Sequence, residues 1–181
     1  MAKFFTQLDA THRAFIGKQH LFFVASAPRI GRVNVSPKGM DCMRIVDDHR
    51  LAYLDLTGSG NETAAHILDN GRITLMFCSF DGDPLILRAY GRGETVLPTD
   101  PQWPALSALF PDLPGARQII VTHIDAVQTS CGFAVPFYQF VEHRPLLLQW
   151  ATKKGAAGLA TYQQEKNTRS IDGLPTPFAV S

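Results

Sequence analysis

A chain of 181 residues is long enough to fold as one domain with a full core, and 45% of its residues are hydrophobic. Its 17 basic and 16 acidic residues give a formal net charge of +1, which argues against the basic stripe of a nucleic-acid-binding protein. No run approaches the ~18 apolar residues that a membrane-spanning helix needs, and polar residues interrupt the N-terminus too early for a signal peptide. We therefore expect a cytoplasmic protein with neither nucleic-acid nor membrane partners.

The cysteines and histidines give no sign of a metal site. Cys42, Cys78 and Cys131 are odd in number and far apart, and the sequence contains no Cys-x-x-Cys pair. The histidines are scattered, without the spacing of metal ligands. The prediction is a reduced protein without a bound metal.

The first half of the chain predicts one helix followed by short strands. Residues 3–18 carry apolar side chains at helical spacing and predict an amphipathic helix. Apolar or alternating runs then predict strands at residues 20–27, 33–36, 42–46 and 51–56.

The second half mixes both kinds of element. A short helix is predicted at residues 62–70, capped by Ser59 or Asn61. A long strand at residues 85–97 is expected to bend near Gly91. The remaining predicted elements are strands at residues 73–80, 118–127 and 133–141 and helices at residues 101–110 and about 145–164. The polar, proline-containing tail from about residue 167 is expected to be mobile.

Short strands with a few helices between them favour a mainly β fold. The sequence lacks the regular alternation of strands and helices that indicates a parallel sheet. A nearly closed, predominantly antiparallel β-barrel with peripheral helices is the natural arrangement. Because no linker or repeat divides the chain, residues 1–181 are expected to form a single domain.

The turn before the helix at residues 62–70 is a candidate anion site. A strand that ends in a glycine-rich turn and enters a helix leaves several backbone N–H groups unpaired. These groups, with the positive end of the helix dipole, suit an anion such as phosphate. The strand at residues 33–36 brings Asn34 and Ser36 to one face and is flanked by the cations Arg32 and Lys38.

Several segments, in their order and spacing, carry a family resemblance. They are residues 20–25, the run Val33-Asn34-Val35-Ser36-Pro37-Lys38-Gly39, residues 53–55 with 58–63, and residues 70–77, 86–93 and 130–136. Over about residues 18–135 the chain resembles the pyridoxamine 5′-phosphate oxidase-like superfamily of FMN-binding split barrels. The resemblance implies a six-stranded split-barrel homodimer that holds FMN in two clefts at the subunit interface.

The resemblance also implies a role for each part of the candidate site. The cations and the turn would bind the FMN phosphate, while Asn34 and Ser36 would meet the ribityl chain or the ring edge. The ring would lie along the strand at Tyr53 and Leu54. Arg88 would place a positive charge near the pyrimidine edge, where it stabilises the negative charge of reduced flavin. The expected cofactor-binding residues are Arg32, Val33, Asn34, Val35, Ser36, Lys38, Tyr53, Leu54, Asp55, Gly60, Asn61, Glu62, Thr63 and Arg88.

The chain departs from the vitamin B6 oxidase of this superfamily at several positions. That oxidase has a Ser-Arg-Lys run where this chain has Asn61, Glu62 and Thr63, so two phosphate-binding cations are missing here. Glu62 would repel a phosphate unless it caps its own helix. The glutamine that the oxidase places against the ring is Ile86 here, and the oxidase's C-terminal arginine–histidine pair has no equivalent. The resemblance therefore implies a divergent member with another substrate.

Two functional hypotheses follow. The first is an FMN-dependent oxidoreductase acting on a small organic substrate, with NADH or NADPH as a candidate electron donor. Flavin would supply the chemistry, and because no residue stands out as an acid or base, no catalytic residue is assigned. The alternative is a non-catalytic protein of the same fold that carries flavin, haem or deazaflavin.

Overall fold

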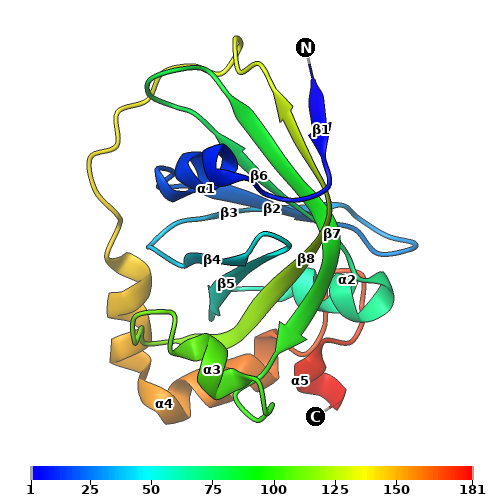
Figure 1. Cartoon of the computed structure of the whole chain (residues 1–181). Coiled ribbons are helices and arrows are strands. Elements are labelled where there is room, and N and C mark those ends of the chain that lie inside the picture. Colours follow the sequence, from blue (N-terminus) through cyan, green and yellow to red (C-terminus); the bar gives the residue numbers. More distant parts are fainter. Residues whose placement is uncertain (1, 181) are drawn as a thin grey trace.

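One antiparallel sheet dominates the computed structural model, which describes residues 2–180 (Figure 1). Its eight strands follow the order β3-β2-β6-β7-β8-β5-β4, with β1 paired to β8. The strands are β1 (Lys3–Phe5), β2 (Phe22–Ser26), β3 (Asn34–Lys38), β4 (Met43–Asp47), β5 (Arg50–Leu56), β6 (Arg72–Cys78), β7 (Ile86–Val96) and β8 (Ala116–Ser130). The helices are α1 (Ala10–Gly17), α2 (Glu62–Asn70), α3 (Trp103–Ser107), α4 (Leu146–Lys166) and α5 (Pro177–Val180). The predicted mainly β, predominantly antiparallel fold is confirmed.

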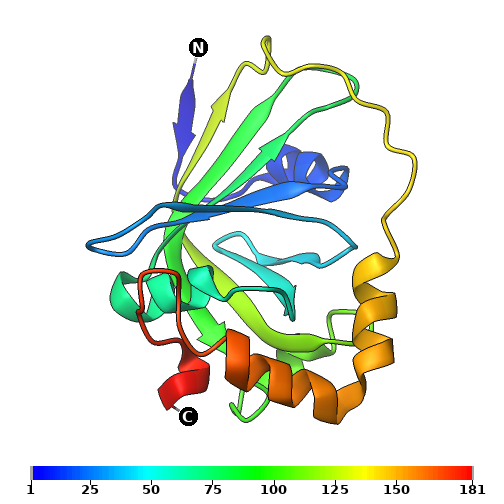
Figure 2. The same ribbon diagram turned by 180° about the vertical axis from the view of Figure 1, so that it is seen from behind.

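The sheet curls around a hydrophobic core into a half-barrel with peripheral helices (Figures 1 and 2). Phe22 on β2 packs against Tyr53 on β5 with ring centroids 5.7 Å apart, although β6, β7 and β8 separate these strands in the sheet. Alternate residues of the central strands point inward, and Val24, Leu75 and Ala89 are fully buried there. The curl brings β3 and β5 to face each other, which positions the candidate site.

The N-terminal segment differs from its prediction. The sequence pattern predicts a helix over residues 3–18, but β1 pairs with the end of β8 and α1 begins only at Ala10. Asp9 accepts a hydrogen bond from the backbone N–H of His12, whose side chain accepts one from the N–H of Asp9. This reciprocal cap fixes the helix start. The segment ahead of it forms β1, one of eight strands in a sheet for which the resemblance implied six.

The bend predicted in the strand at residues 85–97 is confirmed in β7. The pairing register with β8 shifts between Tyr90 and Gly91, which leaves Asp125 as a bulge in β8. A Cβ atom at Gly91 would lie 2.0 Å from the backbone oxygen of His123. The close approach of the two backbones therefore requires glycine.

No strand forms at residues 133–141, contrary to the sequence prediction. These residues follow β8, whose end is flanked by β7 on one side and β1 on the other. Both edges of β8 are already paired at this point, and Pro136 within the segment has no backbone N–H to offer a ladder, so the chain leaves the sheet and exposes Phe133 and Phe137. The helix predicted at residues 101–110 is also shorter in the structure, where it forms α3.

The C-terminal part of the chain returns to the start of α2. Helix α4 bends at Gly155, whose φ of 67° lies outside the helical range, and Figure 2 shows its two limbs at an angle. From Asn167 the chain turns back and lies beside α2 in both ribbon views. The composition of this tail predicts mobility, yet Asn167 and Thr176 are fully buried. The tail therefore contributes to the surroundings of the candidate site.

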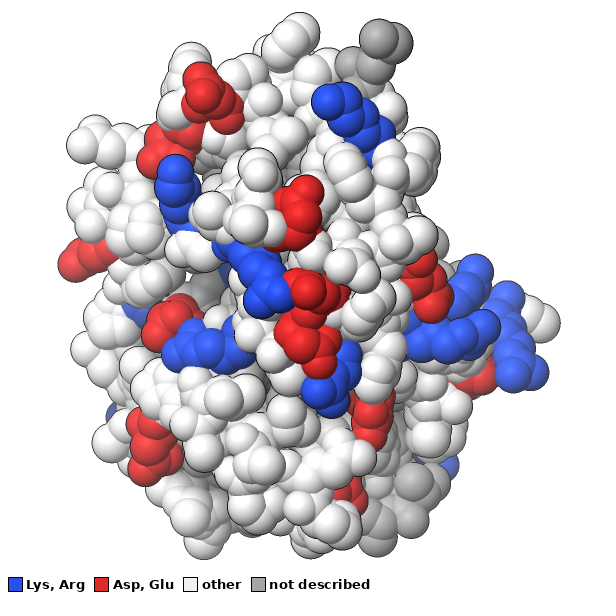
Figure 3. Space-filling model, in the orientation of Figure 1, with Lys and Arg blue, Asp and Glu red and all other residues white. Residues whose placement is uncertain are grey.

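Among residues 2–180 no helix has both the length and the apolar character needed to cross a bilayer. Basic and acidic side chains are interspersed over the face shown in Figure 3, with a group of basic side chains at its right-hand edge. This mixture agrees with the net charge of +1.

Candidate functional site

The turn between β5 and α2 is held by hydrogen bonds at its first residue, Thr57, whereas at its last residue, Asn61, no side chain caps the helix. Thr57 donates its backbone N–H and its hydroxyl to the carbonyl of Gly115, at 2.7 and 2.9 Å. The chain then passes through residues 58–60, and Asn61 takes the N-cap position of α2 without a side-chain cap hydrogen bond. Asn61 therefore occupies the predicted cap position, but its side chain does not make the capping hydrogen bond expected of it. The first backbone N–H groups of α2 are left without a side-chain acceptor.

A cavity of about 330 Å³ lies at this turn, between β3, the end of β5 and the start of α2. We call it the turn cavity. Its lining includes eight residues that the sequence predicts to bind a cofactor: Asn34, Ser36, Lys38, Asp55, Gly60, Asn61, Glu62 and Thr63. The fold therefore brings together the two segments that the sequence singled out separately.

The alternation predicted for β3 places polar side chains at the turn cavity. Asn34, Ser36 and Lys38 are half-buried and line it, whereas the side chain of Val35 is 60% exposed and points outward. The Asn34 side-chain amide donates to the Ser36 hydroxyl at 3.2 Å and to the Thr63 hydroxyl at 3.3 Å. These bonds connect β3 to the first turn of α2 and leave hydroxyl and amide groups at the cavity wall.

Asp55 gathers the cations of the turn cavity around one buried carboxylate. Its Oδ1 lies 2.6 Å from the Lys38 Nζ, and its Oδ2 lies 2.8 Å from the Arg117 Nη2 and 2.7 Å from the Gln118 Nε2. Burial alone would raise the pKa of Asp55, but the charges of Lys38 and Arg117 and the hydrogen bonds from Lys38 and Gln118 hold it well below its usual range. The positive charge that Lys38 and Arg117 bring to the cavity is therefore partly neutralised by Asp55.

Asn61 and Asn167 extend this network into the C-terminal segment. The Asn61 side chain accepts a hydrogen bond from Gln118 at 2.7 Å and donates one to the Asn167 carbonyl at 3.3 Å. The Asn167 side chain accepts from Arg117 at 2.7 Å and donates to the Gly58 carbonyl at 3.0 Å. These bonds occupy the Asn61 side chain and so explain why it does not cap α2.

A second cavity of about 540 Å³ adjoins the first, and we call it the tail cavity. It shares Asn34, Ser59, Gly60 and Glu62 with the turn cavity. Its further lining residues are Arg32, Val33, Lys166, Arg169, Ser170 and Ile171. The two cavities together contain ten of the residues that the sequence predicts to bind a cofactor, Arg32 and Val33 being added to the eight above.

Two acidic side chains, Glu62 and Asp172, bond the tail to residues that line the tail cavity. The Glu62 carboxylate accepts from the Ile171 backbone N–H at 3.0 and 3.1 Å, so Glu62 does not cap its own helix as the sequence suggested. Asp172 pairs with the Arg32 guanidinium and accepts from the Arg32 backbone N–H at 2.7 Å. The tail thereby connects Arg32, just ahead of β3, to the first turn of α2.

The remaining predicted residues lie away from both cavities. Tyr53 and Leu54 are buried in the hydrophobic core, and Val35 points outward. Arg88, between two fully buried neighbours on β7, faces away from the core with its Nη1 3.4 Å from the Ser130 hydroxyl. The structure of one chain therefore does not bring Arg88 to the site at the start of α2.

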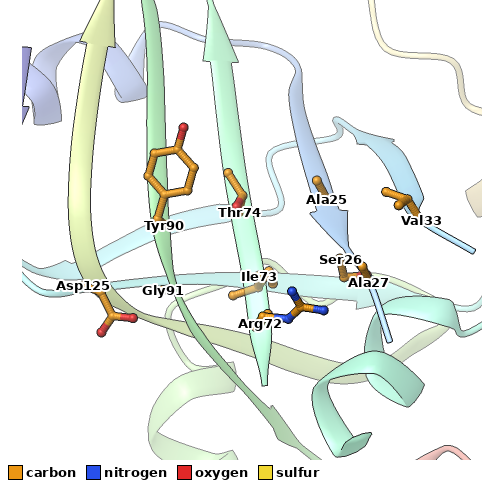
Figure 4. Close-up of a pocket in the computed structure, with 10 residues that line it drawn as sticks. All are labelled: Ala25, Ser26, Ala27, Val33, Arg72, Ile73, Thr74, Tyr90, Gly91 and Asp125. Carbon is orange, nitrogen blue, oxygen red and sulfur yellow. The ribbon is translucent and has the colours of Figure 1, made fainter. Parts of the chain in front are cut away.

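A separate cavity of about 360 Å³ lies on the outer face of the sheet (Figure 4). Thr74 and Tyr90 line it from neighbouring positions on β6 and β7, and Arg72 and Asp125 add one charge of each sign. Of the residues predicted to bind a cofactor, this outer cavity contains Val33 alone. It is therefore a weaker candidate for that role than the site at the start of α2.

The cysteines are all free: Cys42 and Cys78 are buried and Cys131 is exposed. Burial raises the pKa of the Cys42 thiol to about 12, which keeps it protonated at neutral pH. Within the described part of the chain, no group of three or more His, Cys, Asp and Glu side chains is arranged to hold a metal ion.

Comparison with known proteins decides the family. The model of the pyridoxamine 5′-phosphate oxidase family matches residues 8–131. The chain belongs to this family. A relative in the same family, ustO of Aspergillus flavus, is 39% identical over an alignment of 193 residues that covers 97% of this chain and 78% of the relative.

Solved structures agree with the split-barrel fold of the family. HupZ of Group A Streptococcus aligns with a TM-score of 0.57 at 22% identity, over 67% of this chain and 98% of its own. A Clostridium acetobutylicum protein related to general stress protein 26, of the pyridoxinephosphate oxidase family, aligns with a TM-score of 0.51 at 13% identity, over 67% of this chain and 86% of its own. At these identities the likeness concerns the fold alone.

The family match ends before the C-terminal segment that lines the tail cavity. Arg117 and Gln118 lie within the matched residues, whereas α4, Asn167 and Arg169 lie beyond them. The sequence did contain a signal for Arg117 and Gln118, since two polar residues stand at the start of an apolar strand. Buried polar residues are uncommon and usually paired, so this position indicated a buried polar network. Asn167 gave no such signal, since its partners are far away along the chain.

Proposed function

We propose that this protein binds FMN and uses it to transfer reducing equivalents to or from a small organic molecule. FMN would lie at the start of α2, with its phosphate at the helix terminus and its ribityl chain along β3. The observation that carries the proposal is the joining of two separately predicted segments at one cavity: the alternating face of β3 and the glycine-rich turn. Membership of the pyridoxamine 5′-phosphate oxidase family supports it.

The residues present fit the chemistry of FMN. Phosphate suits a helix start whose N–H groups have no side-chain cap, as at α2. A chain of hydroxyl groups suits the Asn34 amide and the Ser36 hydroxyl, which both donate and accept hydrogen bonds. Bound flavin would supply the redox chemistry, while the protein would hold it and set its electrostatic surroundings.

The test is an FMN titration of purified protein followed by a reduction assay. We expect added FMN to bind with quenching of its fluorescence, and the flavin absorbance of the complex to bleach with NADH or NADPH in the absence of oxygen. A protein that takes up no FMN would overturn the proposal at its first step. Arg13→Gln, on α1 and outside both cavities, is a matched control that should bind normally.

A second candidate function is a flavin carrier without turnover, and the state of the cavity carboxylates favours it. Asp55 is ion-paired with Lys38, and its pKa is lowered. A carboxylate that stays charged and paired has a structural role more readily than the role of an acid or base. Glu62 is tied to the tail. Tight FMN binding with no bleaching by either nicotinamide donor would favour the carrier. The same titration with haem or a deazaflavin would show which cofactor is carried.

The proposal also includes a homodimer in which FMN lies at the subunit interface, and a cytoplasmic location. Arg88 and Tyr90 alternate along β7 with the fully buried Leu87 and Ala89, so they lie on the outward face of the sheet, where a partner subunit would pack. Three free cysteines are in keeping with a reducing compartment.

A further inference from the structure

A bound phosphate at α2 would meet a shortage of free positive charge. Lys38 and Arg117 are paired with Asp55, and Arg32 is paired with Asp172. Glu62, in the first turn of α2, adds a negative charge at the same place. A phosphate dianion needs nearby cations as well as backbone N–H groups when a carboxylate lies beside it.

The C-terminal segment brings two cations to this point. Lys166, in the last turn of α4, and Arg169, three residues later, both line the tail cavity, which shares Ser59, Gly60 and Glu62 with the turn cavity. Both side chains are exposed. Neither forms an ion pair with an acidic side chain among residues 2–180.

Asn167 fixes the position of these two cations. It lies between them in the chain, is fully buried and is bonded to Arg117 and Gly58, as described above. Its backbone carbonyl accepts from the Thr176 hydroxyl at 2.6 Å as well as from Asn61. The anchor holds the tail, and with it the two flanking cations, beside the start of α2 (Figure 2). The Arg169 Nη1 also donates to the Gly173 carbonyl at 2.9 Å, a bond within the tail itself.

We propose that Lys166 and Arg169 bind the phosphate of FMN, in place of the two cations that the turn before α2 lacks. This inference rests on the proposed function and adds to it the part of the chain that neutralises the phosphate. The Ile171 N–H assists indirectly, because it holds the Glu62 carboxylate and offsets part of its charge. The phosphate site is thus built from the glycine-rich turn and from a tail outside the matched family region.

The experiment compares FMN with riboflavin, which has the same ring and ribityl chain but no phosphate. Dissociation constants are measured by fluorescence for the wild type, Lys166→Ala, Arg169→Ala and the double variant. We expect each single variant to weaken FMN binding about tenfold and the double variant about 50-fold or more, since each removes one charged contact. Riboflavin binding should be unchanged in all of them.

Lys153→Ala is the matched control, because Lys153 is an exposed lysine on the same helix that lines neither cavity. It should leave the affinity for FMN unchanged. Lys166→Arg should retain most of the wild-type affinity, since it keeps the charge. Raising the NaCl concentration should weaken FMN binding by the wild type more steeply than by the double variant.

The outcomes separate this inference from the function on which it rests. Unchanged FMN affinity in the double variant, or an equal loss for FMN and riboflavin, would overturn the role of the two cations while flavin binding stands. A wild-type protein that binds neither flavin would overturn the proposed function and this inference with it. Urea unfolding of each variant checks that the fold is intact.

Discussion

Lys38 and Asp55 lie on β3 and β5, and their 2.6 Å ion pair crosses the gap between strands that do not pair in the sheet. The sequence predicts Lys38 as a cofactor cation and includes Asp55 among the expected cofactor-binding residues. Their mutual pairing changes the physical role of both, because a cation bound to a buried carboxylate has less charge to offer a ligand. The pair therefore both joins β3 to β5 and forms part of the wall of the turn cavity.

Replacing Asp55 by Asn should destabilise the protein by about 3 kcal/mol, because the substitution leaves the buried Arg117 guanidinium without its counter-charge. Both side chains of that pair are only 4% exposed, so water cannot compensate. Urea unfolding at neutral pH measures the change. The control is Asp41→Asn, since Asp41 pairs with Arg44 at the surface with its side chain 72% exposed. An equal, small effect of both substitutions would contradict the buried role of Asp55.

The contribution of Asp55 should also depend on pH in a definite direction. Its pKa in the folded protein is lowered from the ordinary value of 3.8, so it stabilises the fold above its unfolded pKa and loses this effect as pH falls through the folded pKa. The stability difference between wild type and Asp55→Asn should be largest above about pH 5 and shrink below about pH 4. Urea unfolding of both proteins over a pH series tests this. A difference that stays constant down to about pH 3 would show that the carboxylate is not coupled to folding.

At the scale of elements, β3, the glycine-rich turn and α2 form the part of the site that the sequence predicted. The helix at residues 62–70 appears with those bounds, and Gly71 closes it in the left-handed conformation with φ of 76°. The alternation of β3 correctly divided Asn34 and Ser36 from Val35. These features are local, since a pleated strand and a helix stop depend on residues a few positions apart.

Gly60→Val should affect FMN binding far more than stability. A Cβ at this position would have the flexible end of Glu62 as its nearest neighbour, 3.4 Å away, and the backbone does not require glycine there. We expect a stability change below about 1 kcal/mol. FMN affinity should fall about tenfold or more, because the larger side chain enters the proposed phosphate site.

Urea unfolding and FMN titration of the same preparation test the two halves of this prediction. Gly60→Ala provides a graded control with a smaller side chain and should lie between wild type and Gly60→Val in affinity. Equal losses of stability and affinity would indicate strain in the turn and not obstruction of a ligand.

At the scale of the whole molecule, the outer face of the sheet is the surface on which the proposed dimer depends. Across β3, β2, β6 and β7 the residues at successive paired positions are Pro37, Phe23, Met76 and Arg88. Because Phe23 and Met76 place partly exposed apolar side chains on this face, we expect it to pack against a partner, most simply a second copy related by a two-fold axis. In such a dimer Arg88 would lie at the interface.

We expect a solution mass of twice the 19.9 kDa chain. Met76→Lys, which puts a charge beside Arg88 on the outer face, should shift the protein toward monomer. Leu68→Lys, at an exposed position on α2, is the control and should remain dimeric. Sedimentation equilibrium measures both, and a wild type that is monomeric at tens of micromolar would contradict the proposed dimer.

The sequence by itself determined the mainly antiparallel barrel, the alternating face of β3 and the turn that opens α2, because each depends on short-range pattern and backbone geometry. Only the tertiary structure decided that Lys38 pairs with Asp55 and that the tail lies beside α2. It also decided that the Asn61 side chain donates a hydrogen bond to the carbonyl of Asn167, 106 residues away along the chain. Such contacts depend on how the sheet curls and where the chain returns. Residue spacing alone does not encode them, which is why the cations of the C-terminal segment had no counterpart in the sequence prediction.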